Sequence, residues 1–252
     1  SQGIWPLPTK TPLKSAIHGR QVFDDYSIEK VYFESLPGFY VTGSLYRPRN
    51  KTGPHPAVLC PHGHWSNGRF HEVAGSGVQA QIKLGAEQFT QGGRSPLQAR
   101  CVHLARLGCI VFHYDMIGYA DSVQISFDLA HKFARQRPEM NRPRRWGLFS
   151  PQAESQLQSV MGLQTINSIR SIDFLETLPD VDKKRIAVTG ASGGGTQTFM
   201  LAAIDSRVAA AFPAVMVSTA MQGGCTCENA PLLRIDQGNI DIAAATAPRP
   251  LG

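Results

Sequence analysis

The stretch from Arg185 to Ile204, RIAVTGASGGGTQTFMLAAI, constrains the fold more than any other part of the chain. An apolar segment typical of a buried strand runs into a cluster of glycines, and an apolar segment typical of a helix follows. The chain must therefore turn sharply from strand to helix, with Ser192 at the tip of the turn. Such a turn supports two unrelated chemistries. Its glycines can cradle the pyrophosphate of a dinucleotide, or its G-x-S-x-G motif can present Ser192 as a nucleophile.

The dinucleotide interpretation fits the surrounding sequence poorly. The loop matches the T-G-x-x-x-G-x-G pattern of short-chain dehydrogenases in part, but Thr196 stands where the last glycine belongs. In a dinucleotide-binding fold this loop follows the first strand, whereas here it follows about five predicted strands. The tyrosine–lysine pair of that family should come after the loop, yet the Y-x-x-x-K of this chain, Tyr26 to Lys30, comes before it.

The nucleophile interpretation gains from the same residues. Gly190 and Gly194 leave room around a serine that is held in a strained backbone conformation. The helix that starts after Ser192 directs the positive end of its dipole at a developing oxyanion. The sequence therefore favours Ser192 as the nucleophile of a hydrolase.

Strand and helix patterns alternate along the chain after an antiparallel start. Residues 26–35 and 39–48 predict two strands joined by Leu36-Pro37-Gly38, and alternating strand and helix segments follow. This order predicts an α/β protein with a mostly parallel, twisted sheet, helices on both of its faces and an antiparallel hairpin at the start.

The domain organisation follows from length and local composition. A chain of 252 residues with 42% hydrophobic residues can bury the core of one large domain. We expect a proline-rich, irregular extension over residues 1–25 and one domain over residues 26–252. Two segments without clear periodicity, at about 66–95 and 123–152, are expected to be insertions.

The net charge of +6 is concentrated between His131 and Arg145, where six Lys or Arg stand against one Glu. This segment is either a solvated basic face or, through Arg142, Arg144 and Arg145, a rim that attracts an acidic substrate. It lacks the interleaved aromatic residues of nucleic-acid-binding surfaces, so nucleic acid is not an expected partner. No apolar run reaches about 18 residues, so we expect no membrane span.

The five cysteines and the start of the chain bear on metals and on the cell compartment. Cys225 and Cys227 form C-T-C, but no partners stand near them at metal-ligand spacing, so we expect no metal site. The chain starts SQGIWPLPTK, without Met and without a charged-then-apolar leader. This start fits a removed signal peptide or a trimmed chain, and we favour a secreted or periplasmic protein.

Two further segments accompany the serine motif: CPHGHW at Cys60–Trp65 and FHYDMIGYADS at Phe112–Ser122. Together with the hairpin before them and with CENAPLLR and APRPLG after the serine, they resemble the bacterial acetyl xylan esterase-like branch of the α/β-hydrolases. The resemblance implies an α/β-hydrolase fold and a serine esterase that acts on acylated carbohydrate or a small ester without any cofactor. The residues alone imply only a serine hydrolase. A peptidase, a glucuronoyl esterase and a non-catalytic carbohydrate- or partner-binding homologue therefore stay open.

The resemblance also implies roles for individual residues. The backbone N–H groups of Gly193 and His64 would form the oxyanion hole. Trp65 would line the acyl or sugar pocket, with a place in the core as the alternative. His62 and His64 both precede the serine, so neither fits the Ser–acid–His order of the triad, and His62 is expected to be structural. Asp115 is expected to brace its turn by hydrogen bonds rather than to act as the catalytic acid.

The catalytic base and acid are harder to assign. The last histidine of the chain is His131, so none follows Ser192. Of the downstream carboxylates Glu228, Asp236 and Asp241, Glu228 is the best placed to act as the acid, and anchoring its loop is the alternative role. We expect the base, and the acid with it if Glu228 only anchors the loop, to lie beyond Gly252. The C-terminal part of the fold would then be missing from residues 1–252.

Overall fold

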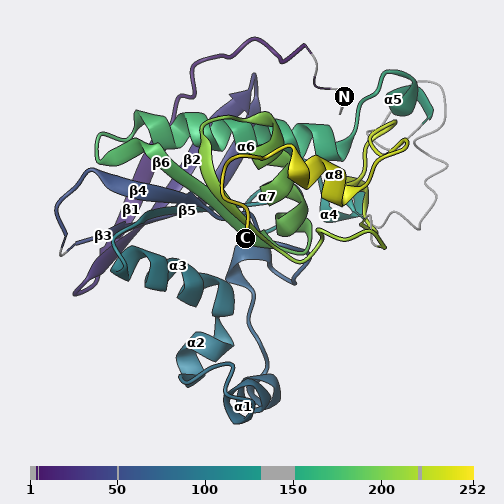
Figure 1. The fold of residues 1–252 in the computed structure, drawn as a ribbon. Coiled ribbons are helices and arrows are strands. Elements are labelled where there is room, and N and C mark those ends of the chain that lie inside the picture. Colours follow the sequence, from purple (N-terminus) through teal and green to yellow (C-terminus); the bar gives the residue numbers. More distant parts are fainter. Residues whose placement is uncertain (1–3, 5, 50, 132–150, 221–222) are drawn as a thin grey trace.

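The computed structural model describes residues 4, 6–49, 51–131, 151–220 and 223–252. In these residues one sheet of seven strands has the order β1-β2-β3-β5-β4-β6-β7 (Figure 1). The strands are β1 (Ala16–Val22), β2 (Tyr26–Leu36), β3 (Phe39–Pro48), β4 (His55–Leu59), β5 (Ile110–Tyr114), β6 (Val181–Ala191) and β7 (Val208–Ala214). β1, β2, β3 and β5 pair antiparallel in turn, and β5, β4, β6 and β7 run parallel.

Apolar side chains on both faces of the sheet explain the layers. On one face, α6 (Val160–Thr177) and α7 (Gly193–Ile204) bury side chains such as Phe174 and Leu201 in the main core. On the other face, α3 (Pro96–Arg106) packs Cys101 and Ala105 against the sheet. Figure 1 shows α6 and α3 on opposite sides of the strands. The predicted α/β architecture, with its antiparallel start and helices on both faces, is confirmed.

The parallel strands bring the predicted site segments together. The carboxyl ends of neighbouring parallel strands lie at one edge of a sheet, and β4, β5 and β6 are neighbours. CPHGHW follows β4, the turn that starts at Asp115 follows β5, and Ser192 follows β6. The three predicted site segments therefore lie at this edge of the sheet.

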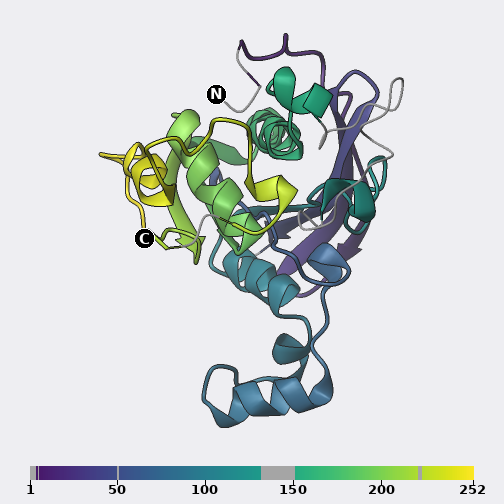
Figure 2. The same cartoon turned by 90° about the vertical axis from the view of Figure 1, so that its right-hand side faces the viewer.

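Two segments differ from the sequence prediction. The extension expected to be irregular contains β1, an edge strand that is exposed along most of its length. An exposed edge strand has no buried face, so its sequence AIHGRQV shows no clear alternation. Residues 66–95 contain η1 (Gly68–Phe70), α1 (Gly75–Lys83) and α2 (Thr90–Arg94), whose glycines hid the helical period. Figures 1 and 2 show α1 and α2 projecting beyond α3, away from the sheet.

The remaining short helices lie within or at the end of the second predicted insertion and after β7. They are α4 (Phe127–Ala130), α5 (Pro151–Ser155), η3 (Thr226–Glu228) and α8 (Asn239–Ala244). Most of the predicted insertion at 123–152 lies outside the described residues. None of the helices in the described part of the chain is both long enough and apolar enough to span a membrane.

Candidate active site

Ser192 forms the turn between β6 and α7. It is the single residue between the end of β6 at Ala191 and the start of α7 at Gly193. Its backbone has φ 56° and ψ −127°, a conformation that costs a residue with a side chain about 1–3 kcal/mol. Its N–H donates to the Ala214 carbonyl at 3.2 Å, and its carbonyl accepts from the Thr196 N–H at 3.0 Å. The surrounding structure therefore holds the serine in the strained strand–turn–helix geometry that the motif requires.

Glycines allow the loop after β4 to pack directly on this turn. A Cβ added at Gly63 would lie 2.7 Å from the Ala191 carbonyl oxygen and 2.8 Å from Ser192 Cβ. A Cβ added at Gly190 would lie 2.5 Å from the Pro61 carbonyl oxygen. Side chains do not tolerate contacts this short, so the steric need for glycine extends from the serine motif to Gly63 in the facing loop.

Gly193 and His64 meet beside the turn. As the first residue of α7, Gly193 has a backbone N–H without an intrahelical acceptor. A Cβ added at Gly193 would lie 2.9 Å from His64 Cε1, so the His64 ring covers this glycine. The half-buried Trp65 has its Cζ3 only 2.8 Å from a Cβ added at Gly63, next to Ser192. The structure thus brings both predicted oxyanion donors and Trp65 to the serine.

Glu228 reaches the same place from the segment after β7. Its side chain is buried, and Oε2 accepts the N–H groups of Gly224 at 3.1 Å and Cys225 at 3.2 Å. Oε1 lies 3.6 Å from a Cβ added at Gly193. Burial raises the pKa of Glu228, and the nearby His64 lowers it in part. One carboxyl oxygen thus anchors the loop, while the other faces the start of α7, so this position is compatible with both predicted roles.

The histidines nearest the serine are engaged elsewhere. His62 is fully buried, with Nε2 accepting the Met116 N–H at 3.1 Å and Nδ1 lying 2.9 Å from the Gly63 carbonyl oxygen. This pattern requires a neutral ring protonated at Nδ1, and burial lowers the pKa of His62 to about 3. His64 directs Nε2 at Cys227 Sγ, 3.0 Å away. In the described part of the chain, no hydrogen bond joins either ring to Ser192 Oγ.

A cluster of two histidines and two cysteines adjoins the site. The side-chain nitrogen or sulfur atoms of His64, His131, Cys225 and Cys227 all lie within 4.8 Å of one another. A hydrogen bond from Cys227 holds the pKa of the Cys225 thiol well below its usual range. The sequence prediction set the C-T-C segment aside because no partners stood nearby. Its partners are 94 and 163 residues away along the chain, and no local spacing reveals them.

Asp115 braces the turn after β5, as predicted. It is fully buried, and Oδ2 accepts the Thr42 hydroxyl at 2.7 Å and the Asp121 N–H at 3.3 Å. Arg69 from η1 forms an ion pair with both Asp115 and Asp121. These partners leave Asp115 in a structural role.

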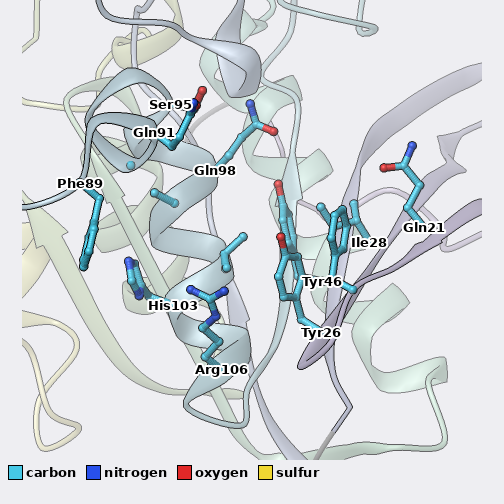
Figure 3. A pocket seen from close by; sticks show the side chains of 14 residues that line it. Gln21, Tyr26, Ile28, Tyr46, Phe89, Gln91, Ser95, Gln98, His103 and Arg106 are labelled. Atoms are coloured by element: carbon cyan, nitrogen blue, oxygen red, sulfur yellow. The ribbon is translucent and has the colours of Figure 1, made fainter. Parts of the chain in front are cut away.

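Other predicted or potential binding features lie away from Ser192 or cannot be placed. Arg142, Arg144 and Arg145 lie outside the described residues, so the basic rim stays a prediction. A groove of about 560 Å³ lies on the α3 face of the sheet, where Tyr26 and Tyr46 line one side and Phe89 another (Figure 3). None of the described residues that line this groove belongs to the predicted site.

The sheet order, the layers and the serine turn between β6 and α7 define an α/β-hydrolase fold. A family model described as acetyl xylan esterase (AXE1) matches residues 164–219, the segment that contains Ser192 and most of α6, β6, α7 and β7. No curated protein matches the chain.

Solved structures of several esterases are similar to the chain. Methylesterase BT1017 has 28% sequence identity and a TM-score of 0.68, with 99% of this chain and 47% of that chain covered. A Bacteroides fragilis protein described as an acetyl xylan esterase has 18% identity and a TM-score of 0.66, with 96% and 63% covered. A glucuronoyl esterase from Solibacter usitatus has 16% identity and a TM-score of 0.58, with 97% and 68% covered.

These comparisons confirm the resemblance to the acetyl xylan esterase-like branch of the α/β-hydrolases. The chain spans about half the length of BT1017 and less than two thirds of the Bacteroides fragilis protein. The two similarities below 20% identity show the fold alone.

Proposed function

We propose that the protein is a serine esterase that hydrolyses ester groups on carbohydrate, with acetyl as the first candidate group. The observation that carries this proposal is the strained backbone of Ser192 at the start of α7, packed against the loop of His64 and Trp65. This arrangement would present the half-buried Ser192 hydroxyl as a nucleophile next to backbone donors, which is what acyl transfer requires.

The reaction follows from this geometry. Ser192 Oγ attacks the ester carbonyl carbon while its proton passes to a histidine base, and the N–H groups of Gly193 and His64 stabilise the oxyanion. The tetrahedral intermediate collapses, the bond to the sugar oxygen breaks, and that oxygen takes the proton from the base. Water then attacks the acyl-enzyme and releases the carboxylic acid and free Ser192.

Glu228 is the proposed acid of this triad. Its Oε2 is fixed by two backbone N–H groups, and its Oε1 faces the start of α7. A buried carboxylate held in this way can orient an imidazole and stabilise the imidazolium ion. Since His62 and His64 are engaged elsewhere, we propose that the base is a histidine outside residues 1–252.

The half-buried indole of Trp65 is the proposed wall of the substrate pocket. An aromatic ring offers a flat apolar surface to one face of a sugar, and this ring lies at the Gly63–Ser192 contact. The names of the similar proteins supply the esters to compare: acetylated xylan, methyl esters and glucuronoyl esters.

The first experiment combines fluorophosphonate labelling with this ester panel. We expect Ser192→Ala to abolish labelling and to lower turnover by several orders of magnitude, because the nucleophile is lost. The control is Ser206→Ala, which changes an exposed serine beyond the far end of α7. Turnover retained in Ser192→Ala would refute the assignment. A wild-type protein that binds acetylated xylan without labelling would be the non-catalytic homologue.

A second experiment tests the source of the base. Residues 1–252 alone should turn over esters only weakly compared with the protein carrying its natural termini, because an oxyanion hole without a base supplies little catalysis. Full activity of residues 1–252 would show that a histidine before the serine acts as base, and would overturn the roles given to His62 and His64.

A further inference from the structure

The side chains of His64, His131, Cys225 and Cys227 form a cluster that has no part in the proposed reaction. Its members come from three separate segments: the loop after β4, the end of α4 and the segment around η3. Cys225, Cys227 and His131 are 7%, 3% and 2% exposed, and both cysteines are free of disulfides. The fold thus gathers two thiols and two imidazoles from distant parts of the sequence at one place.

We propose that these four side chains bind one Zn²⁺ ion at a closed structural site. Two thiolates and two imidazoles are a ligand set that zinc prefers, and four protein ligands leave no position open for water. In a tetrahedral site with Zn–S of about 2.3 Å and Zn–N of about 2.0–2.1 Å, ligand atoms stand roughly 3.3–3.8 Å apart. His64 Nε2 is 3.0 Å from Cys227 Sγ, and His131 Nδ1 is 3.1 Å from Cys225 Sγ. No pair among the four is farther apart than 4.8 Å, so side-chain shifts of about 1 Å complete the tetrahedron.

His131 is already oriented as metal-bound histidines are. Its Nε2 lies 2.8 Å from the Ile117 carbonyl oxygen, so Nε2 carries the proton and Nδ1 directs its lone pair at the Cys225 sulfur. The Thr226 hydroxyl donates to the Ala130 carbonyl, which ties the C-T-C segment to the end of α4. Residues that touch no metal thus hold the ligands in place, as outer-shell partners do at zinc sites.

Two other states of the cluster compete with zinc. A Cys225–Cys227 disulfide would have to close a small ring around Thr226, and it would leave both imidazoles facing an uncharged sulfur pair. Thiol–imidazole hydrogen bonds without metal would join the groups in pairs only. A zinc ion satisfies all four groups at once, and this is the arrangement that their mutual approach favours.

The test measures zinc by elemental mass spectrometry in the protein with its natural termini, purified without chelator from zinc-supplemented cells. We expect one zinc ion per chain, lost in the double variant Cys225→Ser/Cys227→Ser. Cys109→Ser and His18→Ala should retain it, because these control residues lie outside the cluster.

A second measurement uses the wild-type fold, since the double variant can lose stability. The reduced protein is freed of zinc with a chelator and titrated with Co²⁺. We expect the visible absorption of tetrahedral cobalt together with near-ultraviolet thiolate-to-cobalt charge transfer. Substoichiometric zinc combined with the absence of this spectrum would overturn the proposal. So would a mass two hydrogens short in the unreduced protein, traced to a Cys225–Cys227 peptide.

Discussion

Gly63 lies at a tight contact between the serine turn and the loop that faces it, and Gly63→Ala tests this contact. The new methyl carbon would start 2.7 Å from the Ala191 carbonyl oxygen and 2.8 Å from Ser192 Cβ, whereas ordinary contact begins at 3.4 Å. The loop must therefore retreat by roughly 0.6–0.7 Å, because one obstacle is backbone and the other sits on a strained turn. A misplacement of about 1 Å can cost about 100-fold in rate, and overpacking costs about 1–3 kcal/mol.

We expect Gly63→Ala to lower kcat for an aryl acetate about 10- to 100-fold and the free energy of unfolding by about 1–3 kcal/mol. Both are measured in the protein with its natural termini, by steady-state kinetics and by urea unfolding. The control is Gly75→Ala at the start of α1, where an added Cβ meets nothing within 4 Å, so kcat should not change. Wild-type kcat and stability in Gly63→Ala would show that the loop does not abut Ser192. A loss of stability with unchanged kcat would show that the contact at Gly63 stabilises the fold but does not position the groups around Ser192 for catalysis.

Four further predictions concern single features of the chain. Glu228→Gln should lower kcat about 100-fold or more with little change in KM, if Glu228 is the acid; the exposed Asp236→Asn is its control. Trp65→Ala should raise KM for acetylated xylan more than for an aryl acetate, and equal effects would assign Trp65 to the core. Neutralising Arg142, Arg144 and Arg145 should raise KM for a charged polysaccharide more than for a small ester, and equal effects would favour a solvated face. His113→Phe removes two buried ring nitrogens that have no partner among the described residues, and burial holds the pKa of His113 well below 6.5. As pH falls from 7 to 5, His113 therefore takes up a proton in the unfolded wild-type chain but not in the folded one, which lowers the free energy of unfolding of the wild type. The phenylalanine variant has no such group, so its free energy of unfolding should rise relative to the wild type by about 2 kcal/mol over this range. A difference that does not change with pH in urea unfolding would contradict this.

The serine turn could be predicted because all of its determinants are continuous in sequence. An apolar strand, glycines at positions 190 and 194 and an apolar helix allow few backbone paths, and φ 56° at Ser192 is the result. The sheet with helices on both faces could be predicted because the alternation of strand and helix is also continuous in sequence. Asp115 was assigned to its turn by its place directly after a buried strand, and its partners agree.

Features that depend on contacts between distant segments could not be predicted in this way. The need for glycine at position 63 arises from a carbonyl group and a Cβ more than a hundred residues away in the sequence. The histidine partners of Cys225 and Cys227 are also remote, 94 and 163 residues away along the chain. β1 was missed for a different reason: an exposed edge strand buries no face, so selection for burial leaves no alternation in its residues.

His64 contributes to both proposed sites, its backbone N–H to the oxyanion hole and its side chain to the zinc site. The backbone N–H of His64 is the proposed second oxyanion donor, and such a donor contributes about 2.7–4 kcal/mol only if it stays in place while charge develops. The residue itself is exposed, so burial does not fix it. Packing at Gly63 restrains the loop on the side of Ser192. The His64 ring, which covers Gly193, also reaches Cys227, whose Sγ lies 3.0 Å from Nε2. A zinc ion with four protein ligands would anchor that ring and its loop, so that the metal would help position the N–H donor without a free coordination site for the ester.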